Sequence, residues 1–396
     1  MTEIGGSGRL DRRRLLGAGI GAGAALALGG GATALARTAA ARPGGRALRI
    51  GYLPITDASP LLIAHARGLY ERFGVRVERP VRFRAWAELA QALVADRVDV
   101  VHLLMPFAIQ LRYGMMPSLR VVAWNHTGGS ALTVHPSVGE VADLAGRTVA
   151  IPYWWSVHNV VVQRILRGAG LRPVTRDRPS RAAGTVRLVV MSPSDMLPAL
   201  DNGVIGGYIV ADPFCAAAEA RGVGRILRFS GDVWRDHACC VVAMSEELAA
   251  NRPETVQGVL NAVTRAQLAI RADRAAAAGR LSAGYLPQPL KAIRRALTYP
   301  REPYAARGAV TRPDWAGERI EFAPFPFASY TERLVTEMNR TVVDVDRGFL
   351  TGIDPAAVHG ELVDDRFVRA AIRLSGGPTA FGLPATLTRT EEVDTG

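Results

Sequence analysis

Short apolar runs alternate with amphipathic segments from residue 48 onward. Strands are predicted for the apolar runs at 48–52, 75–80, 98–103, 119–124 and 131–134. Ser59 and Pro60 are suited to open a helix that ends at Phe73, before Gly74, and a second helical period covers 86–95. Because these strands alternate with helices, the first part of the chain predicts a βαβ sheet.

A second series of the same kind begins after residue 135. Its strands are predicted at 148–151, 186–191, 207–210 and 225–229, and a strand at 239–244 is expected to return to the first series. Helical segments follow at 253–271, 289–296, 326–350 and 355–374. The pattern predicts an α/β protein with two lobes, each a βαβ sheet flanked by helices, and with the C-terminal helices on the first lobe.

These strands divide the mature chain into lobes. Residues 47–135 and 239–375 are assigned to the first lobe, 136–238 to the second, and 376–396 to a loose tail with little apolar periodicity. Residues 1–36 have the features of an export signal: DRRRLL at 11–16 matches the twin-arginine pattern, and ALA at 34–36 is suited to cleavage. We therefore expect a periplasmic or cell-surface protein, tethered to the membrane if the signal stays uncleaved.

Composition changes this picture little. The net charge of the 396 residues is +12, but the mature chain after residue 36 has no Lys/Arg-dense run and no DNA-reading motif, so nucleic acid is not an expected partner. Cys239 and Cys240 lack a second Cys or His pair at ligand spacing, so no metal is expected, and Cys215 could pair with either of them. Lys291, the only lysine, falls in a late helix, which argues against a Schiff-base cofactor.

The segment from 148 to 165 carries the most information about function. An apolar strand ends in an aromatic turn, and Ser156 is a good N-cap for a helix whose first turn contains His158 and Asn159. Ligands of open α/β sheets bind at such strand ends, where a helix N-terminus offers free N–H groups. His158 is expected to be a neutral hydrogen-bonding group, because the helix dipole disfavours its imidazolium form.

Other polar and aromatic residues fall at comparable crossings. For each one, capping or core packing competes with ligand contact, but the crossings converge on one cleft. The complete set of predicted ligand-binding residues is Thr56, Asp57, Trp86, His102, Met105, Tyr153, Trp154, Trp155, Ser156, His158, Asn159, Asp212 and His237. The chain has no nucleophile elbow, phosphate-binding loop or H-E-x-x-H motif, so no catalytic residue and no enzyme activity is predicted.

The chain resembles a known family over residues 48–271. The segments GYLPITDASP, DLAGRTVAIPYWWSVHN and DVWRDHACCVVAM are similar to nitrate/sulfonate/bicarbonate (NitT/TauT-type) substrate-binding proteins of ABC importers, above all to the nitrate- and bicarbonate-binding branch. The resemblance implies a type II periplasmic-binding-protein fold, a monomer that closes on a small solute, and a membrane permease with its ATPase as partners. By position, Trp86 and His158 resemble the Trp and His that contact the oxyanion.

Differences from that branch leave the identity of the solute undecided. The branch has a lysine where this chain has Ala238, Cys239 and Cys240, and a buried small anion needs compensating donors or a positive charge, which Arg84 or Arg112 could supply by turning inward. Nitrate, bicarbonate or an alkylsulfonate is one class of solute that we expect. A flat heterocycle, such as a pyrimidine or flavin precursor, is the alternative, as is a pyrimidine-synthase-like enzyme on the same fold.

Overall fold

The computed structural model describes residues 46–312, 315 and 317–393 and contains two main sheets. The first sheet has the strand order β2 (Val81–Arg82), β1 (Ile50–Tyr52), β3 (Val100–Leu104), β12 (Cys240–Ser245) and β4 (Leu119–Trp124). β1 runs parallel to β2 and β3, whereas β12 is antiparallel to both of its neighbours. β12, which comes from the later part of the chain, therefore lies between β3 and β4 in the first sheet.

The second sheet, like the first, contains one strand that is antiparallel to both of its neighbours. Its order is β11 (Arg225–Phe229), β6 (Ser130–Val134), β10 (Gly207–Ala211), β7 (Thr148–Ile151), β9 (Thr185–Val190) and β8 (Arg172–Val174). β6 is antiparallel to β10 and β11. The predicted boundary at 135 places this strand in the wrong lobe, because Gly128 and Gly129, with φ of 66° and 85°, turn the chain out of the first sheet before β6.

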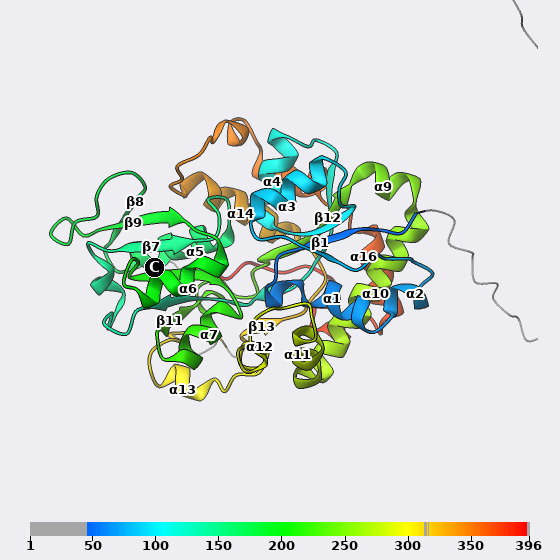
Figure 1. Cartoon of the computed structure of the whole chain (residues 1–396). Coiled ribbons are helices and arrows are strands. Elements are labelled where there is room, and N and C mark those ends of the chain that lie inside the picture. The colour runs from blue at the N-terminus through cyan, green and yellow to red at the C-terminus, as the bar shows by residue number, and fades with distance from the viewer. Residues whose placement is uncertain (1–45, 313–314, 316, 394–396) are drawn as a thin grey trace, which may run out of the picture. The chain divides into compact units, whose positions relative to one another are not determined.

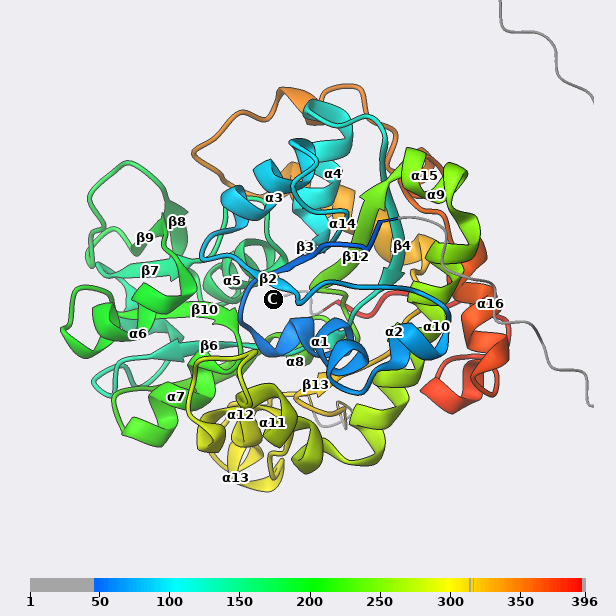
Figure 2. The ribbon, with the colours of Figure 1, turned by 45° about the vertical axis from the view of Figure 1, so that its right-hand side comes forward.

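Helices cover both faces of the first sheet (Figures 1 and 2). α3 and α4 lie on one side, and α1, α10 and α16 lie on the other. The elements around this sheet are η1 (Thr56–Ala58), α1 (Ser59–Ala66), α2 (Leu69–Arg72), α3 (Trp86–Val94), α4 (Met105–Gly114), α9 (Glu246–Asn251), α10 (Pro253–Ala272) and α16 (Arg366–Leu374). The helix predicted from Ser59 to Phe73 is interrupted at Gly68, whose φ of 60° is left-handed.

The helices around the second sheet are η2 (Val141–Leu144), α5 (Val157–Gly168), α6 (Pro193–Asp201), α7 (Phe214–Arg221) and α8 (Ser230–Val233). Ser156 caps α5 as predicted, since its hydroxyl accepts a hydrogen bond of 3.2 Å from the backbone nitrogen of Asn159. The apolar face of α5 is buried, which fixes the aromatic turn that precedes it.

The C-terminal region packs against both sheets. It contains α11 (Arg274–Ser282), α12 (Leu290–Leu297), α13 (Glu302–Ala305), β13 (Ile320–Glu321), which pairs with β5 (Thr127–Gly128), α14 (Ala328–Arg340), η3 (Gly348–Leu350), α15 (Pro355–Leu362) and η4 (Pro378–Phe381). Arg295 of α12 donates to Glu219 of α7 at 3.1 Å. Placing all C-terminal helices on the first lobe was therefore too simple, because the amphipathic pattern of α12 does not specify its partner.

The described part of the predicted loose tail is docked. Phe381 is buried, Trp234 Nε1 donates to Glu391 Oε2 at 3.0 Å, and the guanidinium of Arg389 lies 4.5 Å from the ring centroid of Phe327. The prediction of a loose tail is wrong for 376–393, because charge pairs and single aromatic contacts hold this segment without apolar periodicity. Residues 1–36, the predicted signal, lie outside the described residues, among which no helix has the length and apolarity needed to span a bilayer.

Candidate functional site

Two chain crossings connect the sheets and meet beside η1. Residues 125–129 lead from β4 toward β6, and residues 234–239 lead from α8 to β12. Asn125 Nδ2 donates to the backbone oxygen of Asp57, and Gln267 Nε2 of α10 donates to the backbone oxygen of Asn125 at 2.9 Å. These bonds hold the first crossing against the loop that follows β1.

Asp57 and His126 form a buried pair at this meeting point. His126 Nε2 lies 2.9 Å from Asp57 Oδ2, and neither side chain is exposed. Burial raises the pKa of Asp57 to about 6, although His126 opposes the shift. Burial lowers the pKa of His126, but the Asp57 carboxylate outweighs it and raises the value to about 10. At neutral pH the pair is a carboxylate facing an imidazolium.

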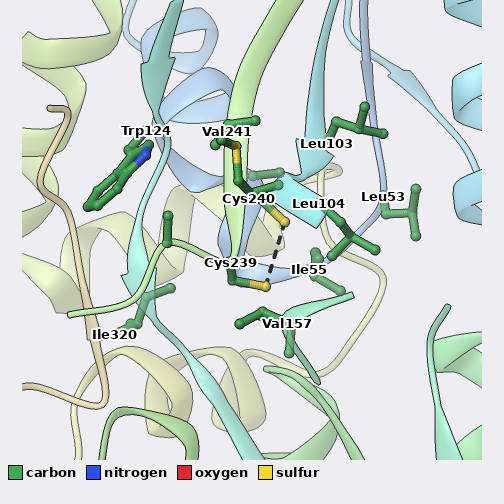
Figure 3. Packing of buried hydrophobic residues seen from close by; sticks show 14 of the residues in the cluster. Leu53, Ile55, Leu103, Leu104, Trp124, Val157, Cys239, Cys240, Val241 and Ile320 are labelled. Carbon is green, nitrogen blue, oxygen red and sulfur yellow. Dashed lines mark hydrogen bonds between the residues drawn. The ribbon is translucent and has the colours of Figure 1, made fainter. Parts of the chain in front are cut away.

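Cys239 and Cys240 complete this group. Figure 3 shows their sulfur atoms pointing toward each other, at a distance of 3.9 Å. The Cys240 thiol also lies 3.5 Å from Asp57 Oδ2. Burial raises the pKa of the Cys240 thiol, and Cys239 and Asp57 raise it further. Burial also acts to raise the pKa of Cys239, but the hydrogen bond from Cys240 and the electrostatic effect of His158 outweigh it, so the pKa of Cys239 is lowered. Both cysteines are free, as is Cys215.

Side chains of the second sheet join the group through His158. Its Nε2 lies 2.9 Å from Ser130 Oγ of β6 and 3.8 Å from Cys239 Sγ. Ser230 Oγ donates to the backbone oxygen of Ser130 at 3.0 Å and lies 2.9 Å from His237 Nε2. The predicted residues His158 and His237 are therefore brought together with both crossings, and the group includes atoms from both sheets.

Several buried polar atoms of this region lack a hydrogen-bond partner among the described residues. They are Asp57 Oδ1, Trp86 Nε1, both ring nitrogens of His102, His126 Nδ1, His158 Nδ1 and His237 Nδ1. Trp86 packs edge-on against His102 with 5.3 Å between ring centroids. Burial lowers the pKa of His102 to about 3, so this ring is neutral. Unpaired buried groups are costly, and their concentration here is typical of a binding site.

Thr56 and Asp212 bond to each other and to other parts of the protein, so they link the two sheets. The hydroxyl of Thr56 donates to the backbone oxygen of Asp212 at 2.9 Å, and its backbone nitrogen donates to the same oxygen at 2.8 Å. The Asp212 carboxylate is bound by the guanidinium of Arg319, with Nη2 2.8 Å from Oδ1, and it accepts the backbone nitrogen of Ala216 at 2.9 Å. Burial raises the pKa of Asp212, against the effect of Arg319.

Asn159 has a structural position in the aromatic turn. Its Nδ2 donates to the backbone oxygens of Trp154 and Val342, and its Oδ1 accepts Gln163 Nε2 at 2.8 Å. The Ser156 hydroxyl also has structural partners: it accepts the backbone N–H of Asn159 and donates to the backbone oxygen of Tyr153 at 2.7 Å.

The remaining predicted residues pack against neighbours. Half-buried Tyr153 stacks on Phe107 with 4.2 Å between centroids, and buried Trp155 packs edge-on against Phe349. Met105 is buried at the start of α4, where its backbone nitrogen donates to the backbone oxygen of Cys239 at 3.0 Å. Whether any of these thirteen residues contacts a solute stays a prediction.

A cavity of about 330 Å³ lies near these elements and is lined from both sheets. The loop after β1 contributes Leu53 and Ile55, the segment after β2 contributes Arg84, and the second sheet contributes Ser194 and Phe214. Arg84 is exposed and lines this cavity, and Lys291 is exposed on α12.

Sequence reasoning missed His126, Ser130 and Arg319 and treated the two cysteines as packing. His126 lies in the predicted connection between two strands, where nothing in the sequence indicates that a second crossing meets it. One signal was available: W-N-H-T-G-G places a histidine and two glycines between apolar strands, and such glycines favour a turn close to other backbone. Arg319 lies far along the chain from Asp212, so no spacing could pair them.

Comparison with known proteins places this arrangement in a family. The model of the NMT1-like family matches residues 41–283 of the 396. The chain belongs to the NMT1-like family. A nitrate/nitrite binding protein, NrtA of Nostoc, is 21% identical over 240 residues, which are 55% of this chain and 52% of that protein. The nitrate import ATP-binding protein NrtC of Synechocystis is 25% identical over 233 residues, 55% of this chain and 34% of that protein.

The fold is that of periplasmic binding proteins. The crystal structure of the periplasmic nitrate-binding protein NrtA from Synechocystis superposes with a TM-score of 0.75 at 19% identity, covering 89% of this chain and 95% of that one. This agreement confirms the predicted fold class and the resemblance to NitT/TauT-type binding proteins. The chain spans about half the length of its Nostoc relative, with 52% of that protein covered. The NrtA relatives are named as binding proteins, in agreement with the prediction that the chain is not an enzyme.

Proposed function

We propose that this protein is the extracytoplasmic solute receptor of an ABC importer. The contact between Cys239 Sγ and His158 Nε2, at 3.8 Å, carries the proposal, because it joins the return strand to the second sheet in the middle of the unpaired polar atoms. A solute held there would touch both sheets, and only such a solute stabilises the closed arrangement of two lobes.

The names of the relatives make oxyanions the first solute class to test. Nitrate, bicarbonate and alkylsulfonates need a buried cation or several donors. Trp86 Nε1 and His158 Nδ1 are unpaired groups that could serve them. Among the described residues, however, both fully buried cations already face carboxylates: His126 faces Asp57, and Arg319 faces Asp212.

That neutralisation favours a second class, a neutral flat heterocycle such as a pyrimidine or flavin precursor. Such a ligand needs hydrogen-bonding groups and aromatic surface rather than net charge. His102 is neutral and unpaired, and it lies edge-on to the indole of Trp86. We therefore propose that the heterocycle class binds at least as well as the oxyanions.

The experiment is a thermal-shift screen of the purified protein against nitrate, bicarbonate, alkylsulfonates, pyrimidines and flavins. A true solute at about 100 times its dissociation constant adds about 2.7 kcal/mol to the free energy of unfolding. Trp86→Phe is the matched variant, because it keeps an aromatic ring and removes an N–H that has no partner among the described residues. We expect it to weaken solute binding while leaving the ligand-free melting temperature nearly unchanged. No stabilisation by any class at millimolar concentration contradicts the receptor proposal.

The partners and the location belong to the same proposal. A permease and an ATPase are proposed partners, supported by the match to part of an import ATP-binding protein. Export by the twin-arginine route, to the periplasm or the cell surface, is proposed from residues 11–16. We propose a monomer, which light scattering with and without solute tests. Replacing Arg12 and Arg13 by lysine should leave the protein in the cytoplasm, as fractionation of the expressing cells would show.

A further inference from the structure

Four metal-ligating side chains converge where the two crossings meet. Asp57 follows β1, His126 belongs to the first crossing, and Cys239 and Cys240 belong to the second crossing and the start of β12. One ligand atom from each residue lies within 4.8 Å of all the others, and all four residues are buried. They come from three separate parts of the sequence, so ordinary neighbourhood along the chain does not explain the cluster.

Two distances within the cluster match the edges of a metal-centred tetrahedron. Zinc bonds of about 2.3 Å to sulfur and about 2.0–2.2 Å to nitrogen and oxygen give edges of about 3.8 Å for S–S, 3.6 Å for S–O and 3.4 Å for N–O. The observed separations are 3.9 Å for Cys239 Sγ to Cys240 Sγ and 3.5 Å for Cys240 Sγ to Asp57 Oδ2. The distance from His126 Nε2 to Asp57 Oδ2 is 2.9 Å, so this edge would have to open by about 0.5 Å to admit a metal.

The polar atoms of the cluster are incompletely satisfied without a metal. Asp57 Oδ1 has no partner among the described residues and is fully buried. His126 Nε2 faces both Asp57 Oδ2 and the backbone N–H of Cys240, at 3.2 Å, and one nitrogen cannot donate to the first and accept from the second at once. The sulfur atoms make long contacts of 3.5–3.9 Å with Asp57 Oδ2, with His158 Nε2 and with each other.

We propose that Asp57, His126, Cys239 and Cys240 form a tetrahedral site for zinc or a similarly soft divalent metal. Two thiolates and an imidazole select such metals over magnesium and calcium, which prefer oxygen ligands. Four protein ligands leave no open position, so the metal is structural and not catalytic. The metal site adjoins the proposed solute site, because its ligand Cys239 also lies 3.8 Å from His158 Nε2, and it would tie both crossings to the loop after β1. The sequence-based expectation of no metal rested on the missing second Cys or His pair, which long-range folding replaces with Asp57 and His126.

The test is a titration of the reduced, chelator-treated protein with Co²⁺, followed by Zn²⁺. We expect one equivalent of Co²⁺ to produce a strong thiolate-to-cobalt absorption that Zn²⁺ abolishes, and Zn²⁺ to raise the melting temperature. The double variant Cys239→Ser, Cys240→Ser should lose this absorption and weaken binding by more than about 100-fold, the upper range for loss of a mere outer-shell partner. Cys215→Ser is the control, because Cys215 is equally buried but bonds to the backbone oxygens of Val210 and Ala131.

The unmodified protein alone can overturn the proposal. Absence of the thiolate-to-cobalt absorption in protein with three titratable thiols contradicts it, even if the serine variants fail to fold. Binding that persists in a folded double variant, or that Cys215→Ser removes, also contradicts it and indicates a different site. Two thiols missing from the thiol count of unreduced protein, with no metal taken up after reduction, would show that Cys239 and Cys240 form a disulfide instead.

Discussion

Two buried aspartates follow parallel strands of the two sheets, yet their surroundings differ. Asp212 follows β10, and its carboxylate is occupied by the Arg319 guanidinium and the backbone nitrogen of Ala216. Asp57 follows β1, and one of its oxygens has no partner among the described residues while the other meets His126 and Cys240. The pKa of each carboxyl is raised by burial. Burial alone therefore does not distinguish the two aspartates, whereas the completeness of their hydrogen bonding does.

This difference gives the two aspartates different roles. The Asp212 group joins β10, α7 and the segment before β13, and each of its carboxylate oxygens already has a partner. The Asp57 group has unpaired atoms and soft ligands, so it can gain from binding. Thr56 lies between them and donates to the backbone oxygen of Asp212, so the two regions are in direct contact.

The largest expected effect is the loss of Arg319. Arg319→Met leaves the buried Asp212 carboxylate without its counter-ion, and breaking such a pair costs about 3–5 kcal/mol. Urea unfolding followed by circular dichroism measures the change. The double variant Asp212→Asn, Arg319→Met should recover part of the loss, because no uncompensated charge remains. A loss below about 1 kcal/mol for the single variant would mean that Asp212 is not the closed structural group described.

We expect a smaller loss of stability from removing one charge of the Asp57–His126 pair. Asp57→Asn keeps the shape but removes one of the charges, and we expect a loss of about 1–3 kcal/mol in metal-free protein, as for a hydrogen bond to a charged group. His126 can respond by losing its proton, which removes the uncompensated charge. The comparison fails if Asp57→Asn destabilises the metal-free protein more than Arg319→Met does, measured under the same conditions.

Acid should affect the Asp57 side through His102. The pKa of this histidine is lowered to about 3 by burial, so the unfolded chain takes up its proton first as the pH falls below about 6.5. The stability is therefore complete well above that value and decreases with acidification, by about 1.2 kcal/mol between about pH 6 and pH 5. Denaturation of wild type and of His102→Gln at both pH values measures how much the free energy of unfolding of each protein falls between pH 6 and pH 5. Subtracting one change from the other removes the contribution of Asp57, which both proteins share. Equal slopes would show that His102 is accessible or already protonated.

The smallest effect is expected at the contact between the two regions. Thr56→Val removes the hydroxyl that donates to the backbone oxygen of Asp212, and the typical cost of such a bond is about 1 kcal/mol. Thr56→Ser keeps the hydroxyl and is the control in the same unfolding experiment. If valine and serine behave alike, the contact does not stabilise the junction.

The sequence was sufficient for the strands but not for the partners between them. Apolar runs located the central strands, and Ser156 located the start of α5, because burial and capping are local properties. Nothing local shows that β6 pairs with β10, or that Asn159 bonds to Val342 across the molecule. The helix predicted to Leu350 ends at Arg340, where the segment Thr341-Val342-Val343 of β-branched residues follows.

Only the local features of the candidate site could be predicted from the sequence. His158 and Asp57 stand at strand ends, where chain geometry alone indicates a ligand. His126 and the cysteines acquire their meaning only from the second crossing, which closes a loop of more than a hundred residues between positions 126 and 239. Asp212 satisfied the same strand-end rule and is occupied by Arg319, so the rule does not distinguish a free carboxylate from a paired one.

The most direct measurement of the difference between the two aspartates is Co²⁺ binding by a matched pair of variants. Asp57→Asn and Asp212→Asn make the same chemical change at the same kind of strand end. The account predicts that folded Asp212→Asn protein still binds one equivalent with the thiolate-to-cobalt absorption of wild type, and that Asp57→Asn binds more than about 100-fold more weakly. Equal binding by both variants, or loss in Asp212→Asn alone, would contradict it.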